Sequence, residues 1–217
     1  MDFHGKTCIV TGGAGFVGSH VVDHLIEGGA DVIIVDDLSG GYRENVHPKA
    51  RFIQKDVNDL KPDDIRGVQV IYHLAAHPAE GLSVFMPYQN TYNNYLSSLK
   101  VLSLAVEYGV ETIVFTSSIA AYGANSRPPF REDDPLDPVD PYGIGKAMVE
   151  KVLRLYGEEF DFNYVILRPF NIYGVRQDLR SHYRNVLGIF INRLMKGEPP
   201  IVFGDGEQQR AFTHISD

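Results

Sequence analysis

The sequence of 217 residues has little cysteine, no tryptophan and no long apolar run. Its single cysteine, Cys8, excludes an intrachain disulfide and most cysteine-based metal sites, and such low use is typical of a reducing compartment. Cys8 falls inside an apolar segment and is expected to be a small core residue. Apolar runs such as residues 32–35 and 113–115 are far shorter than the ~20 residues that span a bilayer. The first residues pass straight into a glycine-rich turn without an apolar leader, so we expect a cytoplasmic protein with no membrane partner.

Positive charge is also in short supply. Twenty Lys and Arg residues stand against 28 Asp and Glu residues, which gives a formal net charge of −8. Because nucleic-acid binding needs a basic stripe that displaces counterions, we expect no nucleic-acid partner. His20 and His24 lie four residues apart on an expected helix, but no third ligand follows at a suitable spacing, so we expect no metal site.

Short apolar segments alternate with helical patterns along most of the chain. The strand-like segments are apolar at successive positions, which is typical of strands covered by helices on both faces. Strand and helix in turn predict an α/β fold of Rossmann type, with a doubly wound parallel sheet. The expected strands are residues 7–10, 31–35, 51–54, 68–74, 111–117 and 162–167, with a short one after Pro200. The expected helices follow the first glycine turn and then occupy residues 88–108, 142–160 and 185–195.

The clearest early motif is the glycine-rich turn at residues 11–18, between the first strand and its helix. Gly12, Gly15 and Gly18 stand where a tight turn, a close approach to a pyrophosphate and close helix–strand packing each favour glycine. The amides at the helix N-terminus would then face the phosphates. Phe16 and Val17 complete the turn, so these five residues predict one dinucleotide-binding segment.

Two acids close the second strand. Asp36 and Asp37 follow Gly18 by eighteen and nineteen residues, where a carboxylate can hold the ribose hydroxyls of adenosine. The same charge would repel the 2′-phosphate of NADP, so NAD is the expected cofactor, although the nearby Arg43 leaves NADP as an alternative.

Further cofactor contacts are expected where the third and fourth strands end. Asp56 and Val57 follow the third strand and are expected near the adenine, with an exposed turn acid as the alternative for Asp56. Leu74, Ala75 and Ala76 end the fourth strand, where small side chains let a cofactor lie against the backbone.

The second decisive motif joins a tyrosine and a lysine. Asp140 and Pro141 suit the N-cap and the first position of a helix, which puts Tyr142 and Lys146 four residues apart on one helical face. A tyrosine with a pKa near ~10 is a poor base at neutral pH, but an adjacent ammonium and a positive nicotinamide both favour phenolate. A chance pair on a surface helix is the alternative, and the nucleotide motif in the same chain weakens it.

Ser117 and Ser118 end the fifth strand, at the carboxyl edge where doubly wound sheets bind ligands. A hydroxyl there can hydrogen-bond the substrate oxygen whose proton Tyr142 takes. Because adjacent residues of a strand point to opposite faces, only one of the two serines is expected to serve.

Together these segments resemble the extended short-chain dehydrogenase/reductase family, and within it the NAD-dependent nucleotide-sugar epimerase/dehydratase branch that includes the UDP-glucose 4-epimerases. The resemblance runs nearly from end to end and is carried by residues 11–18, 36–37, 56–57, 73–76, 116–123, 142–146, 168–174 and 204–217. It implies an NAD-dependent enzyme that acts on a nucleotide sugar, with a UDP-sugar favoured, and a homodimer.

The resemblance also implies roles for single residues. It makes the serine four positions before Tyr122 the catalytic hydroxyl, which selects Ser118. Tyr142 becomes the proton-transferring residue, and Lys146 becomes its modulator and a ligand of the nicotinamide ribose.

The substrate is expected near the end of the chain. The resemblance places the nucleotide diphosphate at Asn171 and Arg210, and it gives Asn94 a role in supporting the site. Guanidinium groups suit phosphate whatever the net charge of the protein. A structural role is the alternative for Arg168, which precedes Pro169. The other arginines of this segment are Arg176, Arg180 and Arg184.

Two departures from the family pattern stand out. Dehydratases of the family carry Asp-Glu directly after the catalytic hydroxyl, and decarboxylases carry a glutamate close by, whereas this chain has Ile119 and Ala120. The resemblance therefore favours epimerisation, at C4 of a UDP-hexose through a transient 4-keto sugar. A dehydratase or reductase of the same fold is an alternative, as is a protein that senses NAD without turnover. Ser97 and Ser98 replace the usual Gly-Thr, a mild change with no obvious catalytic cost.

We expect two domains. Residues 1–170 form the NAD-binding domain with the Ser/Tyr/Lys site, and residues 171–217 begin a smaller nucleotide-sugar-binding domain. The sequence stops inside a motif, residues 214–217, after which members of the family continue. The resemblance therefore implies an apparently truncated C-terminal substrate domain, so NAD binding is expected while activity of the chain is left open.

Overall fold

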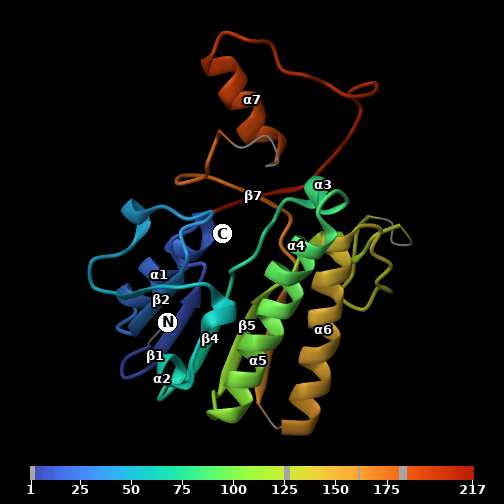
Figure 1. The fold of residues 1–217 in the computed structure, drawn as a ribbon. Helices are drawn as coiled ribbons and strands as arrows, with labels where there is room; N and C mark the ends of the chain where they lie inside the picture. Colours follow the sequence, from blue (N-terminus) through green and yellow to red (C-terminus); the bar gives the residue numbers. More distant parts are fainter. Residues whose placement is uncertain (1–2, 125–127, 161, 181–184) are drawn as a thin grey trace. The chain divides into compact units, whose positions relative to one another are not determined.

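The computed structural model describes residues 3–124, 128–160, 162–180 and 185–217. The chain divides into two compact units, Met1–Arg168 and Pro169–Asp217. This division lies two residues before the boundary expected from the sequence. Figure 1 follows the chain from the blue N-terminus to the red C-terminus.

Unit 1 is built on a parallel sheet of six strands in the order β3-β2-β1-β4-β5-β6. The chain winds outward from β1 in one direction and then returns to β4 on its other side, which places a topological switch point between the carboxyl ends of β1 and β4. The expected doubly wound sheet is confirmed. Its strands are β1 (Thr7–Thr11), β2 (Asp31–Asp36), β3 (Arg51–Gln54), β4 (Val70–His73), β5 (Thr112–Thr116) and β6 (Asn163–Leu167).

The helical segments of unit 1 follow the expected pattern with one difference. The single helix predicted over residues 88–108 consists of two α-helices joined by a π-helical turn, η3. The α-helices of the unit are α1 (Phe16–Glu27), α2 (Pro62–Ile65), α3 (Glu80–Ser83), α4 (Pro87–Thr91), α5 (Ser97–Glu107) and α6 (Pro141–Phe160). The short turns are η1 (Arg43–Asn45), η2 (Val57–Asp59), η3 (Tyr92–Leu96) and η4 (Ile119–Ala121).

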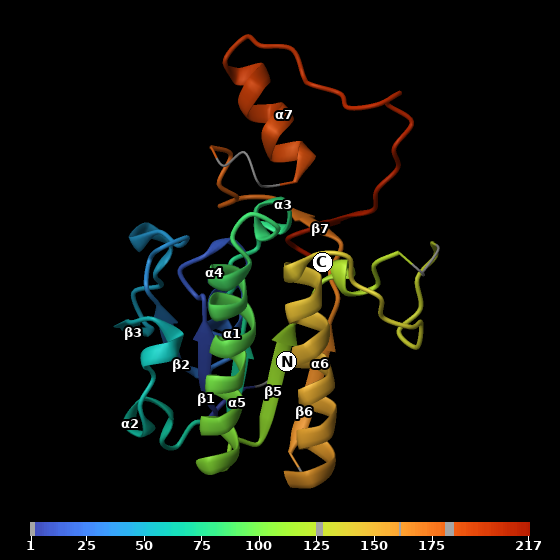
Figure 2. The ribbon, with the colours of Figure 1, turned by 45° about the vertical axis from the view of Figure 1, so that its right-hand side comes forward.

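The core lies on both faces of the sheet because successive residues of each strand point to opposite sides. On one face, Cys8 and Val10 of β1 pack with Val22 of α1. On the other face, Ile9 packs in a larger cluster with side chains of α5 and α6, such as Val149. Figure 2 shows α5 and α6 side by side in front of the strands. Cys8 is fully buried, as expected, and burial raises the pKa of its thiol to about 11.

The edge strand β6 departs from the expected burial on both faces. Tyr164, Val165 and Leu167 keep between 36% and 48% of their surface exposed. Among the strands that the structure describes, β6 pairs with β5 alone. The helix α6 approaches β6 at Gly157, which packs against the ring of Tyr164. An apolar strand sequence therefore does not by itself predict cover on both faces.

The described residues of unit 2 form one helix, α7 (Val186–Met195), and a pair of short parallel strands, β7 (Asn171–Tyr173) and β8 (Phe212–His214). The side chain of Asn185 caps α7 by accepting a hydrogen bond from the amide of Gly188 (3.2 Å) and donates one to the carbonyl of Ile172 (2.6 Å). The strand expected after Pro200 was wrong, since residues 201–203 are exposed and have no strand partner. In the described part of the chain, no helix combines the length and the apolar character needed to cross a membrane.

Candidate cofactor and active site

The glycine-rich turn holds α1 tightly against β1 and β4. Gly12 has a φ of +72°, and a Cβ atom there would lie 2.8 Å from the amide nitrogen of Ala75. A Cβ atom at Gly18 would collide with the carbonyl oxygen of Gly12. Both positions therefore require glycine, the first for its backbone conformation and the second for close packing of the helix on the turn.

The first turn of α1 leaves its backbone amides available to an anion. Gly15 is its N-cap residue and offers no side chain, and no acidic residue lies in the first turn. Phe16 and Val17, which open the helix, are half-buried. A helix that begins on glycines, with no competing cap, fits the pyrophosphate of a dinucleotide.

The end of β2 braces this turn. The buried carboxylate of Asp36 accepts hydrogen bonds from the amides of Ala14 (3.0 Å) and Leu38 (2.8 Å). Burial raises the pKa of Asp36, and the two amides oppose that shift. Asp37 is exposed and accepts hydrogen bonds from Ser39. Both acids lie at the carboxyl edge, where the ribose of a cofactor is expected, and their contact with a ribose stays a prediction.

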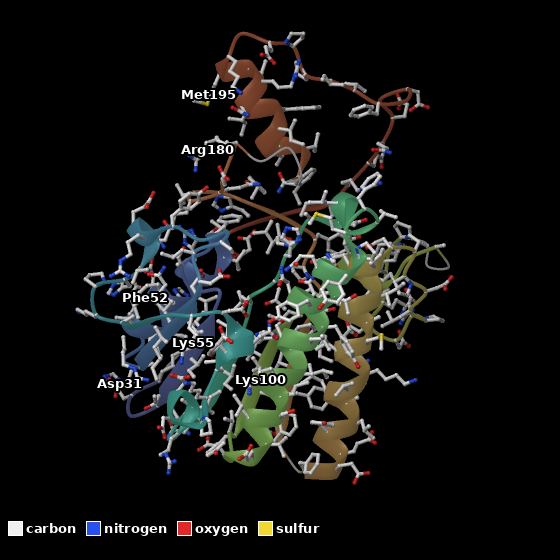
Figure 3. All side chains as sticks on the ribbon, in the orientation of Figure 1. Asp31, Phe52, Lys55, Lys100, Arg180 and Met195 are labelled. Atoms are coloured by element: carbon white, nitrogen blue, oxygen red, sulfur yellow. The ribbon has the colours of Figure 1, made fainter. Side chains whose placement is uncertain are left out.

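The residues expected near adenine have structural partners. Asp56 caps η2 by accepting a hydrogen bond from the amide of Asn58 (2.7 Å), and Val57 is part of the core. The guanidinium of Arg43 lies 4.6 Å from the ring centroid of Phe52, which is labelled in Figure 3. The adenine contacts of Asp56 and Val57 also stay predictions.

A buried chain of hydrogen bonds joins the glycine turn to the end of β4. The hydroxyl of Thr11 accepts hydrogen bonds from the amides of Leu74 (3.2 Å) and Ala75 (3.1 Å) and lies 2.7 Å from Nδ1 of His73. Nε2 of His73 lies 2.9 Å from the hydroxyl of Ser98, which donates to the carbonyl of Asn94 (2.5 Å).

These partners fix the protonation of the imidazole. Thr11 already accepts two bonds, so its own hydrogen goes to Nδ1 of His73, and the ring hydrogen sits on Nε2 and goes to Ser98. Burial lowers the pKa of His73 to about 3, with the charge of Lys146 adding to the effect. The sequence motifs did not predict this role for His73 and Ser98. The available signal was a histidine at the carboxyl end of an apolar strand.

The π-helical turn η3 places Asn94 against the segment after β4. Its side chain accepts a hydrogen bond from the amide of His77 (2.7 Å) and donates one to the carbonyl of the same residue (3.3 Å). A Cβ atom at Gly145 would lie 3.9 Å from Cβ of Asn94, so the turn also meets α6. Asn94 thus holds the segment after β4 through His77, on a turn that packs against α6 one residue before Lys146.

The two serines after β5 have different surroundings. Ser117 is buried and its hydroxyl donates to the carboxylate of Glu150 (2.6 Å). The hydroxyl of Ser118 is half-buried and accepts a hydrogen bond from the amide of Ala120 (3.1 Å), which caps η4. The hydroxyl hydrogen of Ser117 is therefore used by a buried hydrogen bond. Ser118 accepts a hydrogen bond from Ala120, so its own hydroxyl hydrogen can be donated to a ligand.

The helix α6 carries the tyrosine and the lysine on its buried face. Its N-terminus is capped by Asp140, as expected, through a hydrogen bond from the amide of Gly143 (2.9 Å). Lys146 donates from Nζ to the carbonyl of Thr116 (2.7 Å), and Nζ lies 5.8 Å from the ring centroid of Tyr142. Burial lowers the pKa of Lys146 to about 7, and the charge of Glu150 opposes that shift.

A glycine lets α6 reach the Ser118 segment. A Cβ atom at Gly143 would lie 2.6 Å from the carbonyl oxygen of Ala120, two residues after Ser118. The first turn of α6, with Tyr142, therefore lies directly against η4. Gly143 was not singled out from the sequence, although a glycine directly after the tyrosine was a usable signal.

A buried ion pair closes this side of the site. Glu150 is fully buried, and its carboxylate accepts hydrogen bonds from Arg168 (2.6 and 2.8 Å) and Arg154 (3.0 Å) as well as from Ser117. Burial alone would raise the pKa of Glu150, but these donors outweigh it and hold the pKa below its usual range. The structural alternative for Arg168 is therefore confirmed. Glu150 was missed, although it follows Lys146 by four residues on the same helical face.

The residues expected at the nucleotide diphosphate belong to unit 2. Asn171 begins β7 and donates to the carbonyl of Ala211 (3.2 Å), while Arg210 is exposed and donates to the carbonyl of Gln209 (2.8 Å). Both therefore lie on the segments joined by the β7–β8 pair. Arg176 and Arg180 are exposed, and Arg184 lies outside the described residues.

The described residues contain no group of three or more His, Cys, Asp or Glu side chains suited to a metal ion. His20 packs edge-on against Phe16, with 6.1 Å between the ring centroids. His24 is exposed and lies 3.7 Å from Glu27.

The close packing of Gly18 predicts that a methyl group at this position weakens NAD binding. Gly18→Ala should lower the affinity for NAD at least about tenfold, because α1 must move away from the turn that faces the pyrophosphate. Isothermal titration calorimetry measures this. Gly81→Ala is the matched control, because a Cβ atom at Gly81 meets nothing within 4 Å. Equal NAD affinity for both variants would contradict this function of Gly18.

The buried neutral imidazole of His73 predicts a pH dependence of stability. The unfolded chain binds a proton at its usual pKa of 6.5 and the folded chain only near 3, so stability falls as the pH drops below 6.5. Between about pH 7.5 and about pH 5, His73 should cost about 2 kcal/mol of unfolding free energy. Urea denaturation of His73→Gln should show a fall smaller by that amount, and His24→Gln should keep the wild-type fall. The same fall in all three proteins would refute the assignment.

Comparison with known proteins agrees with this geometry. The family model "NAD dependent epimerase/dehydratase family" matches residues 8–217. A putative UDP-glucose 4-epimerase of Methanocaldococcus jannaschii is 40% identical over 213 residues, which cover 96% of this chain and 70% of the relative.

Two solved structures are similarly close. A UDP-N-acetylglucosamine 4-epimerase from Methanobrevibacter ruminantium, in complex with UDP-N-acetylmuramic acid, has a TM-score of 0.93 and 37% identity, covering 99% of this chain and 70% of that one. A UDP-glucose 4-epimerase from Thermotoga maritima with UDP-glucose has a TM-score of 0.91 and 37% identity, with coverages of 97% and 70%. Sugar-nucleotide dehydratases are also among the similar structures.

The chain spans between 53% and 70% of the length of the curated relatives that it matches. The family model nevertheless covers both units, and the glycine turn fits the cofactor for which the family is named. The chain thus belongs to the NAD-dependent epimerase/dehydratase family of the extended short-chain dehydrogenases/reductases, with NAD as its cofactor.

Proposed function

We propose that the chain is an NAD-dependent nucleotide-sugar epimerase that interconverts the 4-epimers of a UDP-hexose. The observation that carries the proposal is the buried face of α6. It presents Tyr142 and Lys146 beside the segment that carries Ser118, at the same carboxyl edge of the sheet as the glycine turn.

These three side chains suit proton transfer at a sugar hydroxyl. Ser118 donates a hydrogen bond to the sugar oxygen, and Tyr142 takes the proton of that oxygen as a phenolate. The ammonium of Lys146, 5.8 Å from the tyrosine ring, stabilises the phenolate. Bound NAD supplies reversible hydride chemistry at the sugar carbon. Tyr142 returns the proton when the 4-keto sugar has presented its other face, so the reaction has no net proton change.

The segment after Ser118 favours epimerisation over dehydration. Ile119 and Ala120 form the start of η4 and carry no acid that would assist an elimination. The names of the similar proteins favour a UDP-sugar. For its diphosphate we propose Asn171 and Arg210 as ligands, because guanidinium and amide donors suit phosphate oxygens.

The reaction can be tested with purified protein and a panel of UDP-, GDP- and dTDP-hexoses, with the products identified by NMR. We expect a 4-epimer from a UDP-sugar, whereas a 4-keto-6-deoxy product would contradict the proposal. Tyr142→Phe should lower kcat by at least about a thousandfold, because it removes the acid–base group, and should leave NAD bound. Tyr108→Phe is the matched control and should leave turnover unchanged. Tyr108 follows α5 and precedes β5, so it lies at the amino ends of the strands, away from the site. Activity that survives in Tyr142→Phe would refute the role of Tyr142.

We further propose that the protein is a homodimer through the outer faces of α5 and α6. Met148 and Leu155 on α6 are 44% and 52% exposed although they are apolar. Sedimentation velocity should give a dimer for the wild-type chain and a monomer for Met148→Glu, because a charge in an apolar interface is costly. Lys49→Glu, the same type of charge change at an exposed residue outside both helices, should stay dimeric. A wild-type monomer would contradict this proposal.

A further inference from the structure

Glu150 has no part in the proton transfer described above, yet it lies on the same face of α6 as the residues that do. Tyr142, Lys146 and Glu150 follow one another at intervals of four residues, and all three are buried. Burial of a carboxylate is costly unless several donors compensate it. Glu150 has three such donor side chains, from β5, α6 and the end of β6.

The first of these donors is next to the proposed catalytic serine. Ser117 follows β5 and donates its hydroxyl to Oε1 of Glu150 (2.6 Å). Because adjacent residues in an extended backbone point to opposite sides, this bond fixes the direction of Ser118 as well. The backbone of Ser118 is extended, with φ of −159° and ψ of 154°.

The second donor reaches the other end of the Ser118 segment. Arg168, just after β6, donates to both carboxylate oxygens of Glu150 from Nε (2.8 Å) and from a terminal nitrogen (2.6 Å). Its guanidinium lies 4.6 Å from the ring centroid of Tyr122, four residues after Ser118. Its remaining nitrogen donates to the carbonyl of Glu132 (3.2 Å).

One carboxylate therefore ties α6 to both ends of the segment that carries Ser118. We propose that Glu150 is a positioning residue, which holds Ser118 and the α6 side chains Tyr142 and Lys146 in register through Ser117 and Arg168. This inference rests on the proposed function of those three residues. Arg168 suits this role because a planar guanidinium can bind both oxygens at once, which a lysine cannot do.

Glu150 also acts on the charge of Lys146. The titratable and charged groups near this ammonium are Glu150 and Tyr142 on α6 and His73 on β4, with Arg168 behind the carboxylate. The negative charge of Glu150 favours the charged form of Lys146. Loss of that charge should lower the pKa of Lys146.

A purely structural ion pair makes a different prediction. Removal of one partner from a buried pair weakens the whole fold. Loss of a positioning contact loosens the Ser118 segment more than the rest of the sheet. Local hydrogen exchange distinguishes the two because each amide reports its own opening reaction.

The test compares Glu150→Gln and Ser117→Ala with the wild type, in the full chain loaded with NAD. In both variants the amides of residues 118–122 should exchange at least about tenfold faster, while those of β1 and β2 change less than about twofold. NMR of labelled lysine should show the pKa of Lys146 lowered by at least about half a unit in Glu150→Gln, and much less in Ser117→Ala, which keeps the charge.

Arg154→Gln is the matched control, because Arg154 binds the same carboxylate from a half-exposed position. It should leave the exchange rates within about twofold of the wild type and shift the pKa of Lys146 by less than about half a unit. Uniform acceleration of exchange across the sheet, or no acceleration at residues 118–122, would overturn the proposal. If Glu150→Gln does not fold, Ser117→Ala decides alone, because it removes only one hydroxyl group.

These readouts need no turnover, so they separate the inference from the proposed function. Local loosening without any 4-epimer from the wild type would leave the positioning role intact and refute the epimerase. If the wild type forms a 4-epimer, Glu150→Gln should lower kcat at least about tenfold with KM within about threefold, since a misplaced group costs the chemical step. Wild-type kcat in a folded Glu150→Gln would overturn the positioning role.

Discussion

Polar side chains buried at the carboxyl edge of a parallel sheet must find partners away from water, and this constraint shapes both halves of the site. At the nucleotide half, Thr11, His73 and Ser98 form a closed series of donors and acceptors behind the glycine turn. At the catalytic half, Glu150 and Arg168 do the same behind the serine and the lysine. In each half, the side chains that we predict to contact a ligand are held by a second set of side chains in the protein interior.

The two groups of buried side chains differ in whether their hydrogen bonds join neutral or charged partners. The histidine network is neutral, since burial keeps the imidazole uncharged and one tautomer satisfies every partner. The glutamate cluster is ionic and uses a two-pronged guanidinium to offset the loss of solvation. Lys146 lies next to both networks, with a pKa of about 7. Because this pKa is near neutral pH, the charge of a neighbouring side chain changes the protonation of Lys146. Glu150 therefore contributes to the electrostatics of the site.

Local signals in the sequence predicted much of this arrangement. The order of strands and helices, the glycine turn and the capped start of α6 each depend on neighbouring residues, so they follow from patterns of a few positions. The pair of Tyr142 and Lys146 followed from helical spacing alone. The close approach of Gly143 to Ala120 did not, because it joins residues more than twenty positions apart.

What could not be predicted depends on tertiary packing. Glu150 and Arg168 are eighteen residues apart on a helix and after an edge strand, and nothing local links them. The π-turn around Asn94 interrupts a helical pattern that is continuous in the sequence. β7 pairs with β8, about forty residues further along the chain, and this distant pairing has no local sequence signal. The apolar residues after Pro200 predicted a strand that the structure does not form.

The proposed 4-epimerase oxidises a sugar carbon and then reduces it again at the same position. UDP-glucose that carries deuterium at C4 tests this most directly, with the label located in the product by NMR. We expect UDP-galactose that retains the deuterium at C4, because the hydride leaves and returns at one carbon. Deuterium found at C6 of a 4-keto-6-deoxy sugar, or lost to the solvent, would contradict it.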